Sequence, residues 1–125
     1  MGMNTRTILV VGGLAAGPSA AAKAKRVNPR AAVTMFESGE SVSYGICETP
    51  YAISGLIEDE AKLVAYTPER LRAEKGFDVK ILNRVEEIDL VNRQITVRDL
   101  GRRERFAVGY DKLILATGST PRRLE

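Results

Sequence analysis

A glycine-rich turn near the N-terminus has the residue types and spacing of a phosphate-binding loop. The stretch Gly12-Gly13-Leu14-Ala15-Ala16-Gly17 lies between an apolar run and an alanine-rich run. In a strand–turn–helix unit, such a turn brings backbone N–H groups and a helix N-terminus to the end of a buried strand, where a phosphate can bind. The full dinucleotide fingerprint is G-x-G-x-x-G, and Leu14 replaces its middle glycine. The turn alone therefore also fits a connection that needs glycine only for its geometry.

Two further stretches would complete a nucleotide site around this turn. Glu37 follows a second apolar run and lies 25 residues after Gly12, slightly more than the usual separation of about 20. Its carboxylate is suited to bind ribose hydroxyls. Ala116, Thr117 and Gly118 follow a third apolar run. Because ligands of α/β folds bind at the carboxyl edge of the sheet, this second turn is expected to reach the same site.

Cys47 is the single cysteine of the chain and the candidate redox residue. If a helix begins at this position, its N-terminal dipole favours the thiolate. A buried, unreactive cysteine explains the residue equally well. With one cysteine and no histidine, an intramolecular disulfide and a His-ligated zinc site are both excluded.

The elements that would position these residues alternate between strand and helix. Buried strands are predicted at 8–11, Ala32–Phe36 and 112–116, with a helix between the first two that ends at Asn28-Pro29. A β-meander is expected in the second half, and its short strands are predicted at 79–82, 85–90, 94–98 and 105–108. The last apolar strand then returns to the parallel sheet.

Two more helices are expected between the first strand–helix–strand unit and the meander. A short one is predicted around 47–56, limited by Pro50 and Gly55. The other begins with Thr67 as N-cap and Pro68 at the first helical position, and Lys75-Gly76 ends it.

Composition and charge restrict the classes of function. The 125 residues form one domain at most, and 44% hydrophobic with 28% charged residues is ordinary for a globular protein. The net charge of +3 comes from interleaved cations and anions, and the basic cluster at 102–105 has no accompanying aromatic residues, so we expect no nucleic-acid partner. No apolar run approaches the roughly 20 residues of a membrane span, and a reducing, cytoplasmic location fits the cysteine usage.

Several motifs together resemble a known family. The chain contains, in order, V-V-G-G-L-A-A-G, F-E-S-G, S-Y-x-x-C-x-x-P-Y, Y-T-P-E-R and Y-D-K-L-I-L-A-T-G. Together they are similar to the flavin-dependent pyridine nucleotide-disulfide oxidoreductases. The resemblance is greatest to the single-cysteine branch of coenzyme A-disulfide reductases, NADH oxidases and NADH peroxidases, because a paired C-x4-C is absent. It implies an α/β fold, a Rossmann-like βαβ FAD-binding domain with a parallel sheet and an inserted β-meander.

The resemblance also implies the positions of a cofactor site and of a catalytic residue. Cys47 would be the redox thiol beside the flavin ring, cycling through a mixed disulfide, a persulfide or a sulfenic acid. Electrons would pass from a nicotinamide to FAD, then to this thiol and to the substrate. The implied FAD-binding positions are Gly12, Ala15 and Gly17 at the pyrophosphate, Glu37 at the ribose, Val85 at the adenine, and Ala116, Thr117 and Gly118 in the second FAD strand.

The same resemblance narrows the range of expected substrates. NADH oxidases and peroxidases usually carry a histidine at the position of Ala15, so the expected substrates are coenzyme A disulfide, polysulfide or related sulfur species. An NADH oxidase or peroxidase, and a non-catalytic nucleotide-binding module, are the alternatives. Ile46 stands where these reductases often have Asn, and Glu48 where a small residue is common. The implied coenzyme A contacts are Ser19, Lys23, Arg26, Ser43, Ile46 and Lys75.

Lys23 and Arg26 are expected to share one helical face because they are three residues apart. That spacing suits phosphate groups, and it equally suits a solvated basic face.

Members of this family continue into an NADH domain and a dimerisation domain. We therefore expect residues 1–125 to be the N-terminal portion of an FAD-binding domain that is truncated here. The expected consequences are that NAD(P)H binds through a domain outside this chain and that the full-length protein is a homodimer. The piece alone is expected to retain little FAD and to turn over no substrate.

Overall fold

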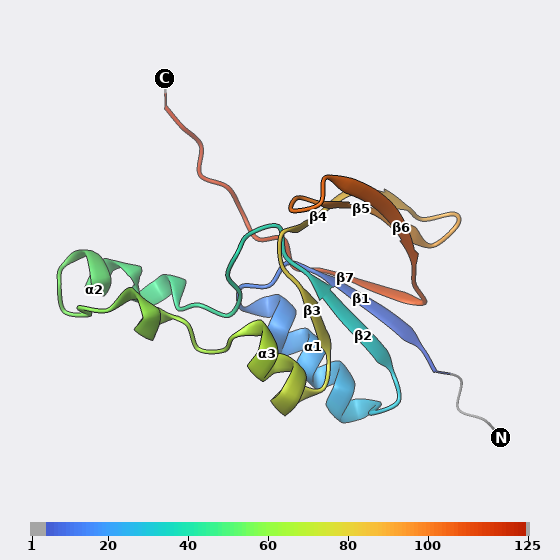
Figure 1. Cartoon of the computed structure of the whole chain (residues 1–125), viewed down its shortest axis with the longest axis horizontal. Coiled ribbons are helices and arrows are strands. Elements are labelled where there is room, and N and C mark those ends of the chain that lie inside the picture. The colour runs from blue at the N-terminus through green and yellow to red at the C-terminus, as the bar shows by residue number, and fades with distance from the viewer. Residues whose placement is uncertain (1–4, 125) are drawn as a thin grey trace.

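The computed structural model describes residues 5–124 of the chain; residues 1–4 and 125 of the predicted domain lie outside this range. The described part contains seven strands: a strand–helix–strand unit comes first, a run of short helical segments follows, and the last five strands are consecutive in the chain (Figure 1). η1 and η2 are 3₁₀ turns, and η3 is a π turn. The elements are β1 (Thr7–Val11), α1 (Ala16–Val27), β2 (Ala32–Phe36), η1 (Ile46–Glu48), α2 (Thr49–Ile53), η2 (Glu60–Leu63), α3 (Pro68–Arg70), η3 (Leu71–Lys75), β3 (Asp78–Lys80), β4 (Asn83–Asp89), β5 (Gln94–Asp99), β6 (Glu104–Gly109) and β7 (Lys112–Leu115).

A four-stranded parallel sheet in the order β3-β2-β1-β7 forms the centre of the fold. β1 pairs with β2 over its whole length, and α1 is the crossover between them. β7 pairs with the other side of β1, which confirms that the last strand returns to the sheet. The α/β class with a parallel sheet and an inserted meander is therefore confirmed.

The strand predicted at 79–82 is present with shifted bounds, but its assignment to the meander is wrong. β3 covers Asp78–Lys80 and pairs in parallel with β2, so it belongs to the central sheet. Val79 is fully buried in that sheet, whereas Leu82 has a φ of 54° and turns the chain away from it. The antiparallel meander therefore consists of β4, β5 and β6.

The sheet is covered on both faces, as its continuous apolar strands require. Successive residues of a strand point to opposite faces. Val10 packs in the cluster that includes residues of α1 and η3, and Leu9 packs against Ile95 and Val97 of the meander. In Figure 1 the helices α1 and α3 accordingly lie on one side of the sheet and the meander on the other.

The two helices predicted between β2 and the meander agree with the structure to different degrees. Thr67 caps α3, because its hydroxyl accepts a hydrogen bond from the Arg70 backbone N–H at 3.3 Å, and Gly76 ends η3 in the left-handed region, as expected. The helix predicted for 47–56 is shorter: Cys47 lies in η1, and the α-helix α2 covers Thr49–Ile53.

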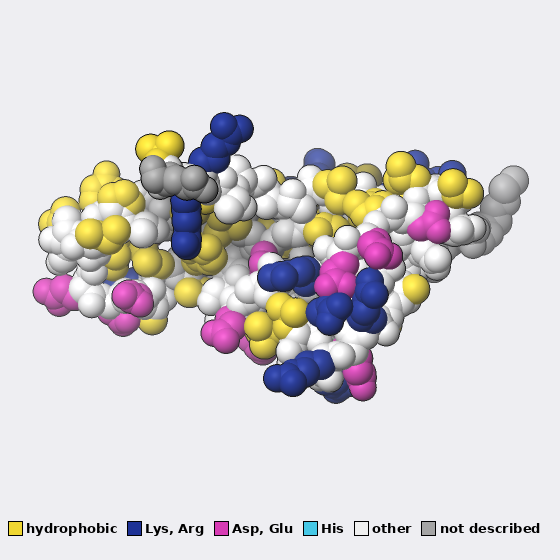
Figure 2. All heavy atoms as spheres, turned by 90° about the horizontal axis from the view of Figure 1, so that it is seen from above, with side chains coloured by type: hydrophobic (Ala, Val, Ile, Leu, Met, Phe, Trp, Pro, Cys, Tyr) yellow, Lys and Arg dark blue, Asp and Glu magenta, His cyan; other side chains and the backbone are white. Residues whose placement is uncertain are grey.

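Residues 45–63 form an extension that we call the cysteine arm. It carries η1, α2 and η2, and α2 lies away from the central sheet (Figure 1). None of the side chains in these three described elements is buried. Figure 2 shows hydrophobic side chains gathered on the surface over this arm, where Ile53 is 82% exposed and Leu56 is 76% exposed. Within residues 5–124, no helix has the length and apolar character to cross a membrane.

Candidate functional site

The glycine turn is formed by close contact between three backbone segments. The Gly12 N–H donates to the Phe36 carbonyl at 2.9 Å, and the φ of Gly12 is 105°. A Cβ added to Gly12 would lie 2.0 Å from the Ala116 carbonyl oxygen, and one added to Gly17 would lie 1.7 Å from the Gly12 carbonyl oxygen. Side chains are therefore excluded at both positions. The turn after β1 touches the ends of β2 and β7, which is the arrangement predicted for a site at the carboxyl edge.

The Glu37 carboxylate ties this turn to the loop after β2. Its Oε2 accepts a hydrogen bond from the Gly13 N–H at 2.8 Å, and its Oε1 accepts one from the Gly39 N–H at 2.8 Å. A carboxylate offers about four lone-pair sites, so acceptor capacity is left for ribose hydroxyls. The contact to Gly13 places Glu37 beside the glycine turn, where the sequence predicted it.

A cavity of about 150 Å³, which we call the nucleotide cavity, opens between the ends of β1 and β2 and the start of β4. Predicted cofactor residues from four segments line it: Gly12, Glu37, Val85 and Thr117. The Ala116 carbonyl lies next to Gly12. Gly118 is exposed and has a φ of 68°. Sequence reasoning did not name the other lining residues, which are Val11, Phe36, Ser38, Asn83 and Arg84.

The N-terminus of α1 can receive an anion. Its N-cap residue Ala15 makes no side-chain capping hydrogen bond, and Pro18 in the first turn has no N–H to satisfy. The first N–H groups of the helix are thus free of a side-chain cap, and a phosphate suits such a terminus. The glycine turn, the Glu37 carboxylate and this terminus together fit the adenosine diphosphate part of FAD.

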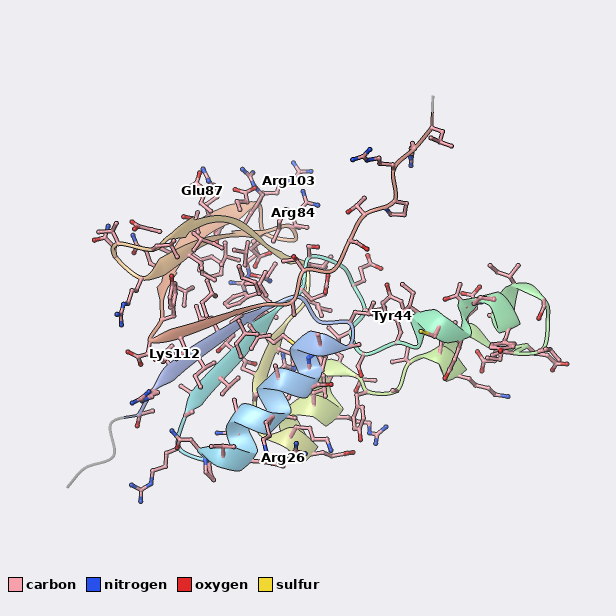
Figure 3. The ribbon with its side chains drawn as sticks, turned by 180° about the vertical axis from the view of Figure 1, so that it is seen from behind. Arg26, Tyr44, Arg84, Glu87, Arg103 and Lys112 are labelled. Atoms are coloured by element: carbon pink, nitrogen blue, oxygen red, sulfur yellow. The ribbon has the colours of Figure 1, made fainter. Side chains whose placement is uncertain are left out.

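A second cavity of about 450 Å³, which we call the cationic cavity, lies between α1 and the segment that ends in η3. It brings together four of the predicted substrate-binding residues: Ser19, Arg26, Ser43 and Lys75. Figure 3 shows Arg26 on α1 and Tyr44 at the base of the cysteine arm. The cavity is also lined by Leu14, Ala15, Pro18, Ala22, Tyr44, Gly45, Ala65, Tyr66 and Leu71.

Lys23 and Ile46 are not among the lining residues of this cavity, in contrast to the predicted set. The helix period explains the absence of Lys23. The lining residues of α1 and its N-cap are 15, 18, 19, 22 and 26, which form one stripe of the helix. At 100° per residue, Lys23 lies just beyond the edge of that stripe, so Arg26 lines this cavity and Lys23 does not.

A third cavity of about 460 Å³ lies next to the cationic cavity and shares Leu14 and Tyr44 with it. Glu37, Glu40 and Glu60 line it, so the two neighbouring cavities differ in charge. Leu14 replaces the middle glycine of the dinucleotide fingerprint, and its side chain forms part of the boundary between them. Within residues 5–124, no three His, Cys, Asp or Glu side chains are grouped as a metal site.

Cys47 is exposed on η1, so the described chain does not bury it, in contrast to the expectation of a buried cysteine. It is not a lining residue of the three cavities described above. The neighbouring Glu48 folds back over Gly45, because residues three apart eclipse each other in a 3₁₀ turn. A Cβ added to Gly45 would lie 2.8 Å from Glu48 Oε2. Gly45 lines the cationic cavity, so the Glu48 carboxylate lies close to one residue of the cavity wall, next in sequence to the thiol.

Comparisons with known proteins find a matching family model and relatives of the same family. A family model described as pyridine nucleotide-disulphide oxidoreductase matches residues 6–125. The coenzyme A disulfide reductase of Staphylococcus epidermidis is 32% identical over 117 residues, covering 94% of this chain. The chain spans only 27% of the length of that relative.

Two solved structures superpose closely on the fold. The crystal structure of reduced CoADR-RHD from Bacillus anthracis has a TM-score of 0.94 and 35% identity, covering 97% of this chain and 22% of that one. The water-forming NADH oxidase from Lactobacillus brevis, bound to NADH, has a TM-score of 0.91 and 29% identity, covering 97% of this chain and 27% of that one.

Proposed function

The chain belongs to the pyridine nucleotide-disulphide oxidoreductase family, and from this premise we propose that it forms the FAD-binding part of an NAD(P)H-dependent oxidoreductase. The proposed substrates are coenzyme A disulfide, polysulfide or related sulfur compounds, reduced through Cys47. The observation that carries the proposal is the cationic cavity: Ser19, Arg26, Ser43 and Lys75 are spread over the sequence and line one space.

The glycine turn and Glu37 support the cofactor half of the proposal. Gly12 and Gly17 bring backbone close to backbone where a pyrophosphate would approach, and Glu37 is hydrogen-bonded to that turn and lines the nucleotide cavity. Thr117 lines the cavity from the segment after β7. When bound, FAD supplies two-electron redox chemistry to this site. The residues named here bind and orient its adenosine diphosphate part.

The cationic cavity supports the substrate half. Arg26 and Lys75 supply two positive charges, and Ser19 and Ser43 supply hydroxyl groups. A ligand with several phosphate groups is complementary to such a wall, because Arg and Lys form charge-assisted hydrogen bonds with phosphate. Coenzyme A is such a ligand and would carry its sulfur toward the arm.

Cys47 would act as the nucleophile on a disulfide substrate. Its thiolate attacks one sulfur, a new S–S bond forms between protein and substrate, and the other half of the substrate leaves as a thiolate. Two electrons and one proton supplied by NAD(P)H oxidation then break this S–S bond, which returns Cys47 to the thiolate and releases the second half of the substrate as a thiol. The exposure of Cys47 is what this reaction requires of the residue.

The similarity to an NADH oxidase keeps that activity as the second candidate. Ala15 lines the cationic cavity and has no group that can transfer a proton, which favours the disulfide reaction. We propose that the protein works in the cytoplasm, because one free, exposed cysteine fits a reducing compartment. The proposal that the full-length protein is a homodimer rests on the family resemblance alone.

The direct test compares electron acceptors for the protein that carries this chain. NADH consumption is measured with coenzyme A disulfide and with oxygen, for wild type and Cys47→Ser. We expect faster consumption with the disulfide, and a loss of about 100-fold or more in the variant with unchanged flavin absorbance. If NADH is consumed as fast with oxygen as the only acceptor as it is with coenzyme A disulfide, the oxidase is favoured. For the isolated chain, stabilisation by ADP but not by coenzyme A in a thermal-shift measurement would favour a nucleotide-binding module.

A further inference from the structure

Two cations lie over the ring of Tyr66, a residue that the proposed function has not used. The Arg70 guanidinium carbon is 4.8 Å from the ring centroid, and the Lys75 Nζ is 5.2 Å from it. Both distances are within the roughly 6 Å over which a cation is attracted to an aromatic ring. Tyr66 and Lys75 both line the cationic cavity, so this contact is part of its wall.

The ring itself is held by packing. Tyr66 is partly buried and packs against the apolar cluster that covers the helix side of the sheet. The next residue, Thr67, caps α3, and η3 ends at Gly76 directly after Lys75. The ring and the backbone of Lys75 are therefore fixed relative to each other, and only the Lys75 side chain is free to choose a rotamer.

Arg70 and Lys75 differ in their other partners. Arg70 forms an ion pair with Glu74 at 2.9 Å and donates to the Ala65 carbonyl at 3.2 Å. The hydrogen bond to Glu74 raises the pKa of Arg70 above its ordinary value, so its charge is already compensated. Lys75 forms no ion pair with a described carboxylate within 4.0 Å. Its charge is thus available to a ligand in the cavity.

We propose that Tyr66 is a positioning residue that holds the Lys75 ammonium in the wall of the cationic cavity, where it meets a ligand phosphate. The inference rests on the proposed function for the identity of that ligand. A lysine side chain is flexible and loses much rotamer freedom when it is held. Contact with the ring restricts the Lys75 side chain before the ligand binds, so less freedom is lost on binding. Because cations already lie over the ring, Tyr66 recognises the ligand through Lys75 rather than by stacking on a base.

The test uses adenosine 3′,5′-bisphosphate, which carries the 3′-phosphate and one of the two 5′-phosphates of coenzyme A and lacks its thiol. Affinities are measured by titration calorimetry for wild type, Tyr66→Phe, Tyr66→Leu, Lys75→Met and the double variant Tyr66→Leu/Lys75→Met. We expect Tyr66→Phe to bind like wild type and Tyr66→Leu to bind about two- to fivefold more weakly. In the Lys75→Met background, Tyr66→Leu should have no further effect, because the residue acts through Lys75.

A measurement without ligand separates this inference from the proposed function. The Lys75 ε-methylene protons should show an upfield ring-current shift that Tyr66→Phe keeps and Tyr66→Leu loses, with circular dichroism confirming that each variant is folded. Absence of the shift in wild type, or an equal loss of affinity from Tyr66→Leu with and without Lys75, overturns the inference. If the shift is present and the bisphosphate does not bind, the proposed coenzyme A site and the ligand half of the inference are wrong, and the positioning of Lys75 stands.

Discussion

The central sheet and the cysteine arm carry the two halves of the proposed chemistry, and they are built in different ways. Around the glycine turn, Gly12 and Gly17 are in contact with the backbone of other segments, and Glu37 is bound by two N–H groups. On the arm, Cys47 lies in a 3₁₀ turn with no buried side chain. The nucleotide half is therefore fixed by contacts within this chain, whereas the position of the thiol is not fixed by packing of the arm.

The arm is attached at its base rather than along its length. The Gly45 N–H donates to the Leu63 carbonyl at 2.7 Å, and Tyr44 forms an isolated β-bridge with Val64. Above this base, Ile53 of α2 and Leu56 in the segment after it are exposed. Substitutions in the sheet should consequently lower the free energy of unfolding, and substitutions in the arm should leave it nearly unchanged.

The largest contrast is expected between two glycines that both have positive φ. Gly12→Ala places a methyl group 2.0 Å from the Ala116 carbonyl oxygen and strains the backbone, so the free energy of unfolding should fall by more than about 3 kcal/mol. Gly55→Ala on the arm meets no atom within 4 Å and should cost about 1 kcal/mol for its φ of 82°. Urea denaturation followed by circular dichroism measures both. Equal losses would contradict the comparison.

The next contrast removes an apolar side chain from each region. Met35 of β2 is 0% exposed and Ile53 of α2 is 82% exposed. Met35→Ala should lower the free energy of unfolding by about 2–5 kcal/mol because it leaves a cavity in the core. Ile53→Ala should change it by less than about 0.5 kcal/mol. Thermal unfolding measures both variants, and a large loss from Ile53→Ala would mean that the arm packs against the body in solution.

A smaller, pH-dependent effect is expected at Asp78, where η3 meets β3. Burial raises the pKa of its carboxyl, but the hydrogen bond from Arg72 and the charge of Lys80 outweigh this, and the net pKa is lowered. A lowered pKa stabilises the folded state above the unfolded value of about 3.9, and this contribution is lost as the pH falls through the folded value. Asp78→Asn should therefore lose about 0.5–1 kcal/mol at pH 7 and progressively less in acid.

The matched control for Asp78 lies on the arm. Asp59 caps η2 by accepting a hydrogen bond from the Ala61 N–H at 2.9 Å. Asparagine can keep that cap, so Asp59→Asn should leave the unfolding free energy unchanged at both pH values. If both variants lose the same stability in urea titrations at pH 7, the ion pair at Asp78 contributes nothing specific.

The smallest expected effect concerns the charge beside Cys47. Glu48 lies next to the thiol in sequence, so its carboxylate should repel an anionic reagent more than a neutral one. Glu48→Gln should raise the ratio of the iodoacetate to the iodoacetamide labelling rate about twofold at low salt. Mass spectrometry of the labelled chain gives both rates. Glu104→Gln in the meander is the control and should leave the ratio unchanged; an unchanged ratio in Glu48→Gln would show that this carboxylate does not act on the thiol.

Sequence patterns predicted the elements whose signals are local. The bounds of β2, the N-cap Thr67 and the end at Gly76 follow from apolar periodicity and capping chemistry, and all are confirmed. The strand at 79–82 was placed in the meander because a short apolar run does not reveal its pairing partner. The contact of Lys75 with Tyr66 could not be predicted, because the distance between their side chains depends on how α3 and η3 fold.

In the candidate site, the residue types follow directly from the amino-acid order: the glycines of the turn, Glu37, Cys47 and the cations. Their individual roles as ligands of a cofactor or substrate stay predictions. The folded chain determines which of these residues meet. It brought Arg26 to the cavity and left Lys23 at its edge, since a helix rotates by 100° per residue and only one stripe faces a neighbour. It exposed Cys47 for the same kind of reason: burial depends on what packs against a turn, and on the arm nothing in the described chain buries this residue.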